Sequence, residues 1–189
     1  MTTPKASFDL SQISRQVSSD GKKIPPVDQW NPDFCGDIDM KILRNGQWMY
    51  NGTPIGREAM VKLFSSILWK EEDKYFLKTP VEKVGIEVED VPFHIVSLDV
   101  KEGALGQELH FTTKTDEHIV VDQSHPLRVE TDPTTGEPSP YVYVRFGMEA
   151  LVNRSVFYQL VELAQEVTVD NVPSLVVYSS GNPYILGTV

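Results

Sequence analysis

The sequence predicts an α+β fold arranged as two domains. Apolar residues recur with a period of two in many short runs, which is typical of strands with one buried face, and with a helical period in two longer stretches. At 189 residues the chain is long enough for two domains that each bury a core. We expect a partly helical N-terminal arm over residues 1–24, an α+β domain over 25–83 and a β-rich domain with a helix over 84–189.

The N-terminal arm carries Phe8, Leu10, Ile13 and Val17 at spacings that favour a short amphipathic helix. Residues 21–26 contain a glycine and two prolines, which would end that helix. Terminal segments are often poorly ordered unless tertiary contacts hold them. We therefore expect the compact body of the protein to begin after this arm.

The first domain is expected to open with a hairpin. Apolar and polar residues alternate over residues 38–42, and Asn45 and Gly46 then supply a pair that favours a tight turn before a return strand over 47–50. From Gly56 the period becomes helical. The apolar stripe of this predicted helix consists of Met60, Leu63, Phe64, Ile67 and Leu68.

A central stretch over residues 75–89 reads YFLKTPVEKVGIEVE and predicts two strands joined at a break. Thr79 and Pro80 form the break, because proline is poorly tolerated inside a sheet. Lys78 and Lys83 flank it. We expect this charged break to lie where the two domains meet.

The second half is predicted to be rich in strands and to contain one helix. Asn153 is a good helix cap, and the residues after it carry an apolar stripe that ends near Ala164. A last strand is expected over residues 175–178. The other predicted strands cover residues 93–100, 107–113, 118–121, 127–130 and 141–146.

The two predicted helices have similar surroundings, which suggests an internal repeat. Each follows a strand, begins near an arginine and leads into another strand. Aligning Arg57 with Arg154 gives a lag of 97 residues (154 − 57) and superimposes the apolar positions of both helices. Two unrelated amphipathic helices can also be aligned in this way, so a degenerate duplication and chance similarity both remain open.

Charge is distributed unevenly along the chain. Residues 1–85 hold 12 basic and 11 acidic side chains, whereas residues 86–189 hold 5 and 16, within a total formal charge of −10. The acidic second half disfavours nucleic acid and anionic membranes as partners. The chain shows neither a membrane-spanning apolar run nor a secretory signal, so we expect a cytoplasmic protein. The lone Cys35 cannot form an internal disulfide.

A candidate site for a small anionic ligand follows from the cations near the predicted domain junction. Arg57 would place a guanidinium near a helix N-terminus, where backbone amides also attract anions. The full candidate set is Arg57, Lys83 and Arg128 for the anionic part, Thr79 and His125 for hydrogen bonds, and Trp48 for stacking. Solvated charges, a structural turn at His125 and core packing of Trp48 are the competing interpretations.

No metal or cofactor site is expected. Asp33, Asp37 and Asp39 could offer oxygen ligands to Mg²⁺ or Mn²⁺, but a solvated sheet face explains the same pattern. The four histidines lack the close spacing of zinc signatures. The sequence also lacks the glycine-rich nucleotide motifs and the serine nucleophile elbow. No catalytic residue is predicted.

The segments WNPDFCGDIDMKILRNGQWMYNGTPIGREAMVKLFSSIL and EDKYFLKTPVEKVGIEVEDVPF closely resemble the bacterial family catalogued as domain of unknown function 1285. The resemblance covers most of the chain. It implies two α+β domains with a repeated motif, the second similar to pleckstrin homology folds. It also implies a ligand site between the domains, for a nucleotide-like molecule, and a role in signal transduction. It transfers no catalytic residue.

Three functional hypotheses follow. The leading one is a non-catalytic sensor module that binds an anionic, nucleotide-like small molecule at the domain interface. The second is a protein interaction module whose acidic second half binds a basic partner. The third is a metal-dependent hydrolase that acts through Asp33, Asp37 and Asp39.

Overall fold

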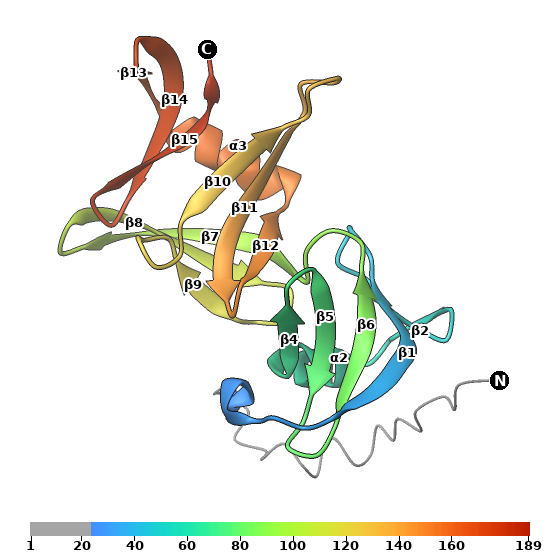
Figure 1. The fold of residues 1–189 in the computed structure, drawn as a ribbon. Coiled ribbons are helices and arrows are strands. Elements are labelled where there is room, and N and C mark those ends of the chain that lie inside the picture. Colours follow the sequence, from blue (N-terminus) through green and yellow to red (C-terminus); the bar gives the residue numbers. More distant parts are fainter. Residues whose placement is uncertain (1–23) are drawn as a thin grey trace. The chain divides into compact units, whose positions relative to one another are not determined.

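The computed structural model describes residues 24–189, and the chain divides into two compact units (Figure 1). The N-terminal unit ends at Pro92 and the C-terminal unit begins at Phe93. The boundary predicted after Lys83 is corrected, because the strand that begins at Lys83 pairs with strands on both sides within the N-terminal unit. The predicted arm helix lies outside the described residues.

The N-terminal unit is a six-stranded sheet with one α-helix. The strand order is β3-β2-β1-β6-β5-β4, in which β1 and β6 are parallel and all other neighbours are antiparallel. Its elements are η1 (Val27–Gln29), β1 (Phe34–Ile42), β2 (Trp48–Tyr50), β3 (Thr53–Pro54), α2 (Glu58–Ser66), β4 (Leu68–Glu71), β5 (Lys74–Lys78) and β6 (Lys83–Val88).

The core of the N-terminal unit lies between α2 and one face of the sheet. Phe64 of α2 is fully buried and stacks on Trp48 of β2, with 6.2 Å between ring centroids. Leu77 and Val84 face each other across β5 and β6 and are also buried. The opposite face of the sheet therefore carries the side chains that alternate with these core residues.

The predicted helix over 56–68 is shorter in the structure and is followed by a strand that the sequence did not indicate. The helix ends at Ser66, and Leu68 belongs to β4, which pairs with β5 through a turn in which Glu72 has a φ of +53°. The strand was not predicted because the run of charged residues over 70–74 is typical of a solvated loop. The break at Thr79 is confirmed, since it separates β5 from β6.

The C-terminal unit contains a mixed six-stranded sheet, a three-stranded antiparallel sheet and one α-helix. The larger sheet has the order β10-β11-β12-β7-β8-β9, with β12 and β7 parallel, and the smaller has the order β13-β14-β15. The elements are β7 (Phe93–Gly103), β8 (Gly106–Thr113), β9 (His118–Val120), β10 (Leu127–Thr131), β11 (Pro138–Arg145), β12 (Met148–Val152), α3 (Arg154–Leu163), β13 (Gln165–Val169), β14 (Val172–Ser179) and β15 (Asn182–Thr188).

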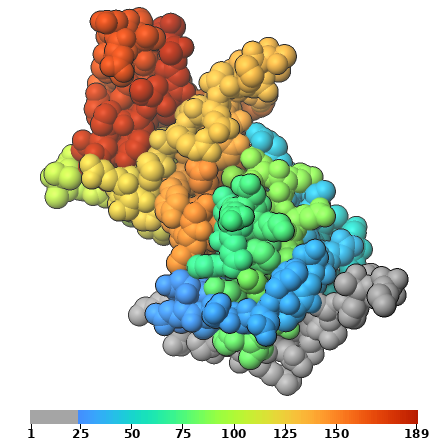
Figure 2. Space-filling model, viewed as in Figure 1, coloured from blue at the N-terminus to red at the C-terminus, as the bar shows by residue number. Residues whose placement is uncertain are grey.

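The smaller sheet of the C-terminal unit forms the red block in Figure 2. Ser179 of β14, which is fully buried, is one of the residues that join it to the larger sheet. The Ser179 hydroxyl accepts a hydrogen bond from the Leu109 amide at 2.9 Å and donates one to the Val121 carbonyl at 2.6 Å. The helix α3 is capped as predicted, because the Asn153 side chain accepts a hydrogen bond from the Val156 amide.

The two larger sheets have the same topology. Each sheet consists of a set of six strands that are consecutive in the sequence. The first three strands of the set pair as consecutive neighbours, the last three do the same, and the first strand pairs in parallel with the sixth. The predicted alignment of the two helices is nevertheless wrong. α2 lies between the third and fourth strands of its set, whereas α3 follows the sixth, so a lag of 97 residues does not align the sheets.

The described part of the chain is therefore mostly β, in two units, with α2 and α3 as its α-helices. None of the helices in residues 24–189 combines the length and hydrophobicity needed to cross a membrane.

Candidate functional site

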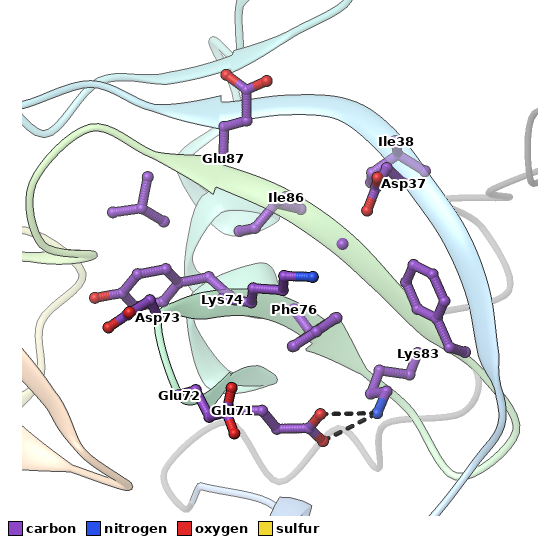
Figure 3. A pocket seen from close by; sticks show the side chains of 14 residues that line it. Asp37, Ile38, Glu71, Glu72, Asp73, Lys74, Phe76, Lys83, Ile86 and Glu87 are labelled. Atoms are coloured by element: carbon purple, nitrogen blue, oxygen red, sulfur yellow. Dashed lines mark hydrogen bonds and ion pairs between the residues drawn. The ribbon is translucent and has the colours of Figure 1, made fainter.

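A groove of about 900 Å³ lies on the N-terminal sheet (Figure 3). Residues of β1, β4, β5 and β6 and of the β4–β5 turn line it, so the groove belongs to a single unit. The lining residues are Phe34, Asp37, Ile38, Glu71, Glu72, Asp73, Lys74, Tyr75, Phe76, Lys83, Gly85, Ile86, Glu87 and Val88.

Two phenylalanines give the groove an apolar part. Phe76 on β5 lies opposite Gly85 on β6, and Phe34 on β1 lies opposite Lys83 on β6. The rings of Phe34 and Phe76 meet edge to face, with centroids 5.9 Å apart and an interplanar angle of 84°. Phe34 leaves 55% of its surface exposed, so much of a large aromatic side chain is accessible to solvent beside the groove.

Gly85 leaves space in the middle of the groove. A Cβ atom at Gly85 would lie 2.0 Å from Asp37 Oδ1 and 3.7 Å from Phe34 Cε2. Any other residue at this position would therefore displace the Asp37 carboxylate. The absence of a side chain on β6 allows the carboxylate and the phenyl ring to lie beside the same point of the sheet.

Lys83 forms an ion pair at one end of the groove (Figure 3). Its ammonium donates to both Glu71 carboxylate oxygens, at 2.9 and 3.1 Å, and lies 5.0 Å from the centroid of the Phe76 ring. The hydrogen bond from Lys83 holds the pKa of Glu71 below its usual value. Glu71 is therefore ionised at neutral pH, and it forms an ion pair with Lys83, the cation that was predicted to bind a ligand.

Lys83 is the only predicted ligand-binding residue among those that line the groove. Thr79 is fully buried, and its hydroxyl accepts hydrogen bonds from the amides of Val81 and Glu82, so it stabilises the β5–β6 turn. Trp48 is 4% exposed in the core, which is the packing interpretation that the sequence left open. Arg57 is exposed and precedes α2 as its N-cap residue.

The two remaining predicted residues belong to the C-terminal unit and have partners there. Arg128 binds both carboxylate oxygens of Glu149 at 2.8 Å and one oxygen of Glu130 at 2.6 Å. These contacts, led by the hydrogen bond with Glu149, raise the pKa of Arg128. His125 closes a turn, because its amide donates to the Asp122 carboxylate at 2.8 Å. Any anion at Arg128 would compete with two carboxylates.

The aspartates and histidines do not assemble a metal centre in the described part of the chain. Across residues 24–189, no group of three or more His, Cys, Asp or Glu side chains is placed to hold a metal ion. Asp37 instead lines the groove. His110 Nδ1 lies 2.9 Å from His118 Nε2, and His110 Nε2 lies 2.8 Å from Glu108, which forms a hydrogen-bonded row on β8 and β9.

The histidine row predicts a pH dependence of stability. Burial, and then His110, lowers the pKa of His118 below its ordinary value of 6.5, with a further lowering by Lys101 and an opposing effect of Asp99. The unfolded chain therefore binds this proton more readily, so the stabilisation is complete above pH 6.5 and is lost as pH falls through the lowered pKa. Unfolding in urea should show a smaller loss of stability between pH 7.5 and pH 5 in His118→Asn than in the parent protein. Equal losses would contradict this assignment.

Sequence reasoning missed Phe34, Phe76, Asp37 and Glu71 as a group. The alternation on β5 did place Phe76 and Lys74 on one face, which was an available signal. The pairing of β1 with β6 joins residues that are about 50 positions apart, such as Asp37 and Gly85. A single sequence does not reveal that pairing.

Comparisons with known proteins agree with this two-unit division. Residues 25–91 match the model of the domain of unknown function (DUF1285), N-terminal domain, and residues 92–186 match the protein of unknown function (DUF1285), C-terminal domain. A comparison with curated proteins found no significant match.

Two crystal structures resemble the chain. A DUF1285 family protein from Silicibacter pomeroyi DSS-3 is 47% identical, with 97% of each chain covered and a TM-score of 0.85. A DUF1285 family protein from Shewanella baltica OS155 is 29% identical, with 65% of this chain and 90% of that chain covered and a TM-score of 0.52. Since the two family models together cover residues 25–186, this chain belongs to the DUF1285 family.

Proposed function

We propose that this chain is a non-catalytic ligand-binding module and that the groove on the N-terminal sheet is its ligand site. The observation that carries the proposal is the exposed Phe34 ring, which meets Phe76 in a groove of about 900 Å³. Small-molecule sites are concave and combine an apolar surface with a few polar groups. The groove has both, with Asp37, Lys74 and the Lys83–Glu71 pair as its polar part.

The composition of the groove favours binding over catalysis. The residues that line it include no histidine, cysteine, serine or threonine, so they offer no thiol, no serine or threonine nucleophile and no imidazole base. Glu71 is held ionised by Lys83, so it is a poor general acid at neutral pH. Ligand recognition is the activity that this lining supports.

An anionic, nucleotide-like ligand is the alternative occupant, and Lys74 and Lys83 are the observation in its favour. The family resemblance adds a pleckstrin-homology-like C-terminal domain and a role in signal transduction, and we keep these, together with the cytoplasmic location expected from the sequence, as parts of the proposal. Docking of a basic protein partner on the C-terminal unit is a second candidate function. The excess of 16 acidic over 5 basic side chains in residues 86–189 favours it.

Titration of the full chain with a neutral aromatic probe, 2-naphthylmethanol, tests the groove by isothermal calorimetry. Phe34→Ala should weaken probe binding roughly threefold to tenfold, since an aromatic pair contributes about 0.5–1.5 kcal/mol. Val81→Ala is the matched control, because Val81 is an apolar residue of the same unit that is 65% exposed and does not line the groove.

The proposal requires that the probe binds, that Phe34→Ala weakens binding and that Val81→Ala leaves it unchanged. Absence of binding at millimolar probe concentrations would contradict the proposed function. Equal affinities for the parent protein and Phe34→Ala would show that the probe binds elsewhere, and this result would contradict the assignment of the groove.

A further inference from the structure

Acidic residues outnumber basic residues in the lining of the groove, and one of the basic residues forms an ion pair. Its lining contains five acidic and two basic residues, which gives a formal net charge of −3. Of the two cations, Lys83 is held by Glu71, so an incoming anion would have to displace a carboxylate before it could use Lys83. Lys74, which extends across the groove in Figure 3, is the other cation. The electrostatic environment therefore disfavours a ligand with net negative charge.

Asp37 is the carboxylate that faces the middle of the groove. It makes no side-chain hydrogen bond or ion pair with any residue in the described range 24–189. Its Oδ1 atom lies over Gly85, where only the absence of a Cβ atom leaves room for it. A carboxylate in this position can accept hydrogen bonds from a ligand without first losing a protein partner.

Phe34 supplies the second part of the same recognition site. Its ring lies beside the point of β6 where the Asp37 carboxylate lies, and more than half of its surface is exposed. The face of an aromatic ring attracts cations, with a contribution of about 0.5–1 kcal/mol at exposed sites. A carboxylate next to an exposed ring is a combination that favours an ammonium group with an attached apolar body.

We propose that the groove selects ligands that carry an amine cation next to an aromatic or apolar group, with Asp37 and Phe34 as the residues that contact the ammonium. This inference rests on the proposed function, because it names the chemical class of the ligand of the same groove. The apolar body of the ligand would lie against the Phe34 and Phe76 rings. The Lys83–Glu71 pair would remain intact when the ligand binds.

Three probes with the same naphthyl body separate the charge preference from binding itself. They are 2-naphthylmethylammonium, neutral 2-naphthylmethanol and anionic 2-naphthoate, each titrated into the full chain at pH 7 and low ionic strength. The ammonium should bind roughly threefold to thirtyfold more tightly than the alcohol, because an exposed ion pair and a cation–π contact both contribute. The naphthoate should bind more weakly than the alcohol.

Asp37→Asn should reduce the affinity for the ammonium to about that for the alcohol and change the affinity for the alcohol far less, since an amide oxygen still accepts a hydrogen bond from a hydroxyl. Asp39→Asn is the matched control, since Asp39 is an exposed aspartate of the same strand outside the groove. A second variant, Lys74→Gln, should strengthen binding of the ammonium and weaken binding of the naphthoate.

The failure of this inference can be distinguished from that of the proposed function. If the alcohol binds and depends on Phe34 while the naphthoate binds as tightly as the ammonium or more tightly, the amine preference is wrong and the groove remains the site. If the ammonium preference persists unchanged in Asp37→Asn, the assignment of Asp37 is wrong. If none of the three probes binds, both proposals are contradicted.

Discussion

Glu117→Ala is expected to destabilise the C-terminal unit by about 3–5 kcal/mol, because it removes the Glu117 carboxylate from the largely buried guanidinium of Arg145. Arg145 contacts both carboxylate oxygens of Glu117, and the two side chains are 14% and 21% exposed. Arg145 also lies 4.8 Å from the centroid of the Phe93 ring. Burial lowers the pKa of Arg145 and Glu117 opposes this, but a guanidinium stays protonated at neutral pH.

Urea unfolding at pH 7, followed by circular dichroism, measures this effect. Glu130→Ala is the matched control, because Glu130 is 64% exposed and its partner Arg128 keeps the contacts with Glu149. The control should lose about 1 kcal/mol or less. A double variant, Glu117→Leu with Arg145→Met, should recover much of the stability lost in Glu117→Ala, since apolar replacement removes the largely buried charge of Arg145 together with that of Glu117. A loss of stability in Glu117→Ala as small as that in Glu130→Ala would show that the Arg145–Glu117 pair is not required for the stability of the C-terminal unit.

Phe64→Ala is expected to destabilise the N-terminal unit by about 3–5 kcal/mol, because it removes a fully buried ring from the contact between α2 and the sheet. Trp48 stacks on Phe64 and is 4% exposed, so its fluorescence should report the loss of packing. Chemical unfolding followed by tryptophan emission provides the measurement.

Phe34→Ala is the control for this core substitution, because it removes the same side chain from the same unit at a position that is 55% exposed. It should change stability far less while weakening probe binding. The two variants therefore separate a residue that stabilises the fold from one that contacts a ligand. Similar destabilisation by both would show that Phe34 is part of the core, and it would remove the main argument for the groove.

The sequence predicted those elements whose turns and periodicity are distinctive. Two strands around Thr79, the capped helix after Asn153 and the strands predicted over residues 93–100 and 107–113, which Gly103 and Gly106 help to connect, are all present. Each has a local signal, namely a proline break, a capping side chain or a pair of glycines. Local chemistry therefore determines these elements largely by itself.

Three strands that were missed, β12, β13 and β15, adjoin two-residue turns. β12 follows Phe146 and Gly147, β13 precedes Asp170 and Asn171, and β15 follows Ser180 and Gly181. Both residues of each pair have positive φ values, which is the geometry of two-residue hairpin turns. Phenylalanine and serine are rare in that conformation, so the turns were not recognised and two predicted strands were assigned the wrong ends.

The candidate site was less predictable than the fold, because it depends on which strands are neighbours. Lys83 was identified from its charge, but its partner Glu71 lies on β4, and the two side chains meet across the intervening strand β5. In the C-terminal unit Arg128 on β10 likewise reaches Glu149 on β12 across β11. In both pairs an aromatic ring on the strand between the two charges, Phe76 or Tyr141, lies within 5.0 Å of the cation. The cation lies on the sixth strand of the set in the N-terminal unit and on the fourth strand in the C-terminal unit. Sheet topology, rather than local sequence, determines both pairs.

Amide chemical shifts of the ¹⁵N-labelled full chain, recorded during titration with 2-naphthylmethylammonium, test the central claim most directly. We predict that the largest shifts occur at Phe34, Asp37, Phe76 and Gly85, and that they saturate with a single affinity. Shifts that are absent, or that are confined to residues 93–189, would contradict the claim that the N-terminal groove is the ligand site.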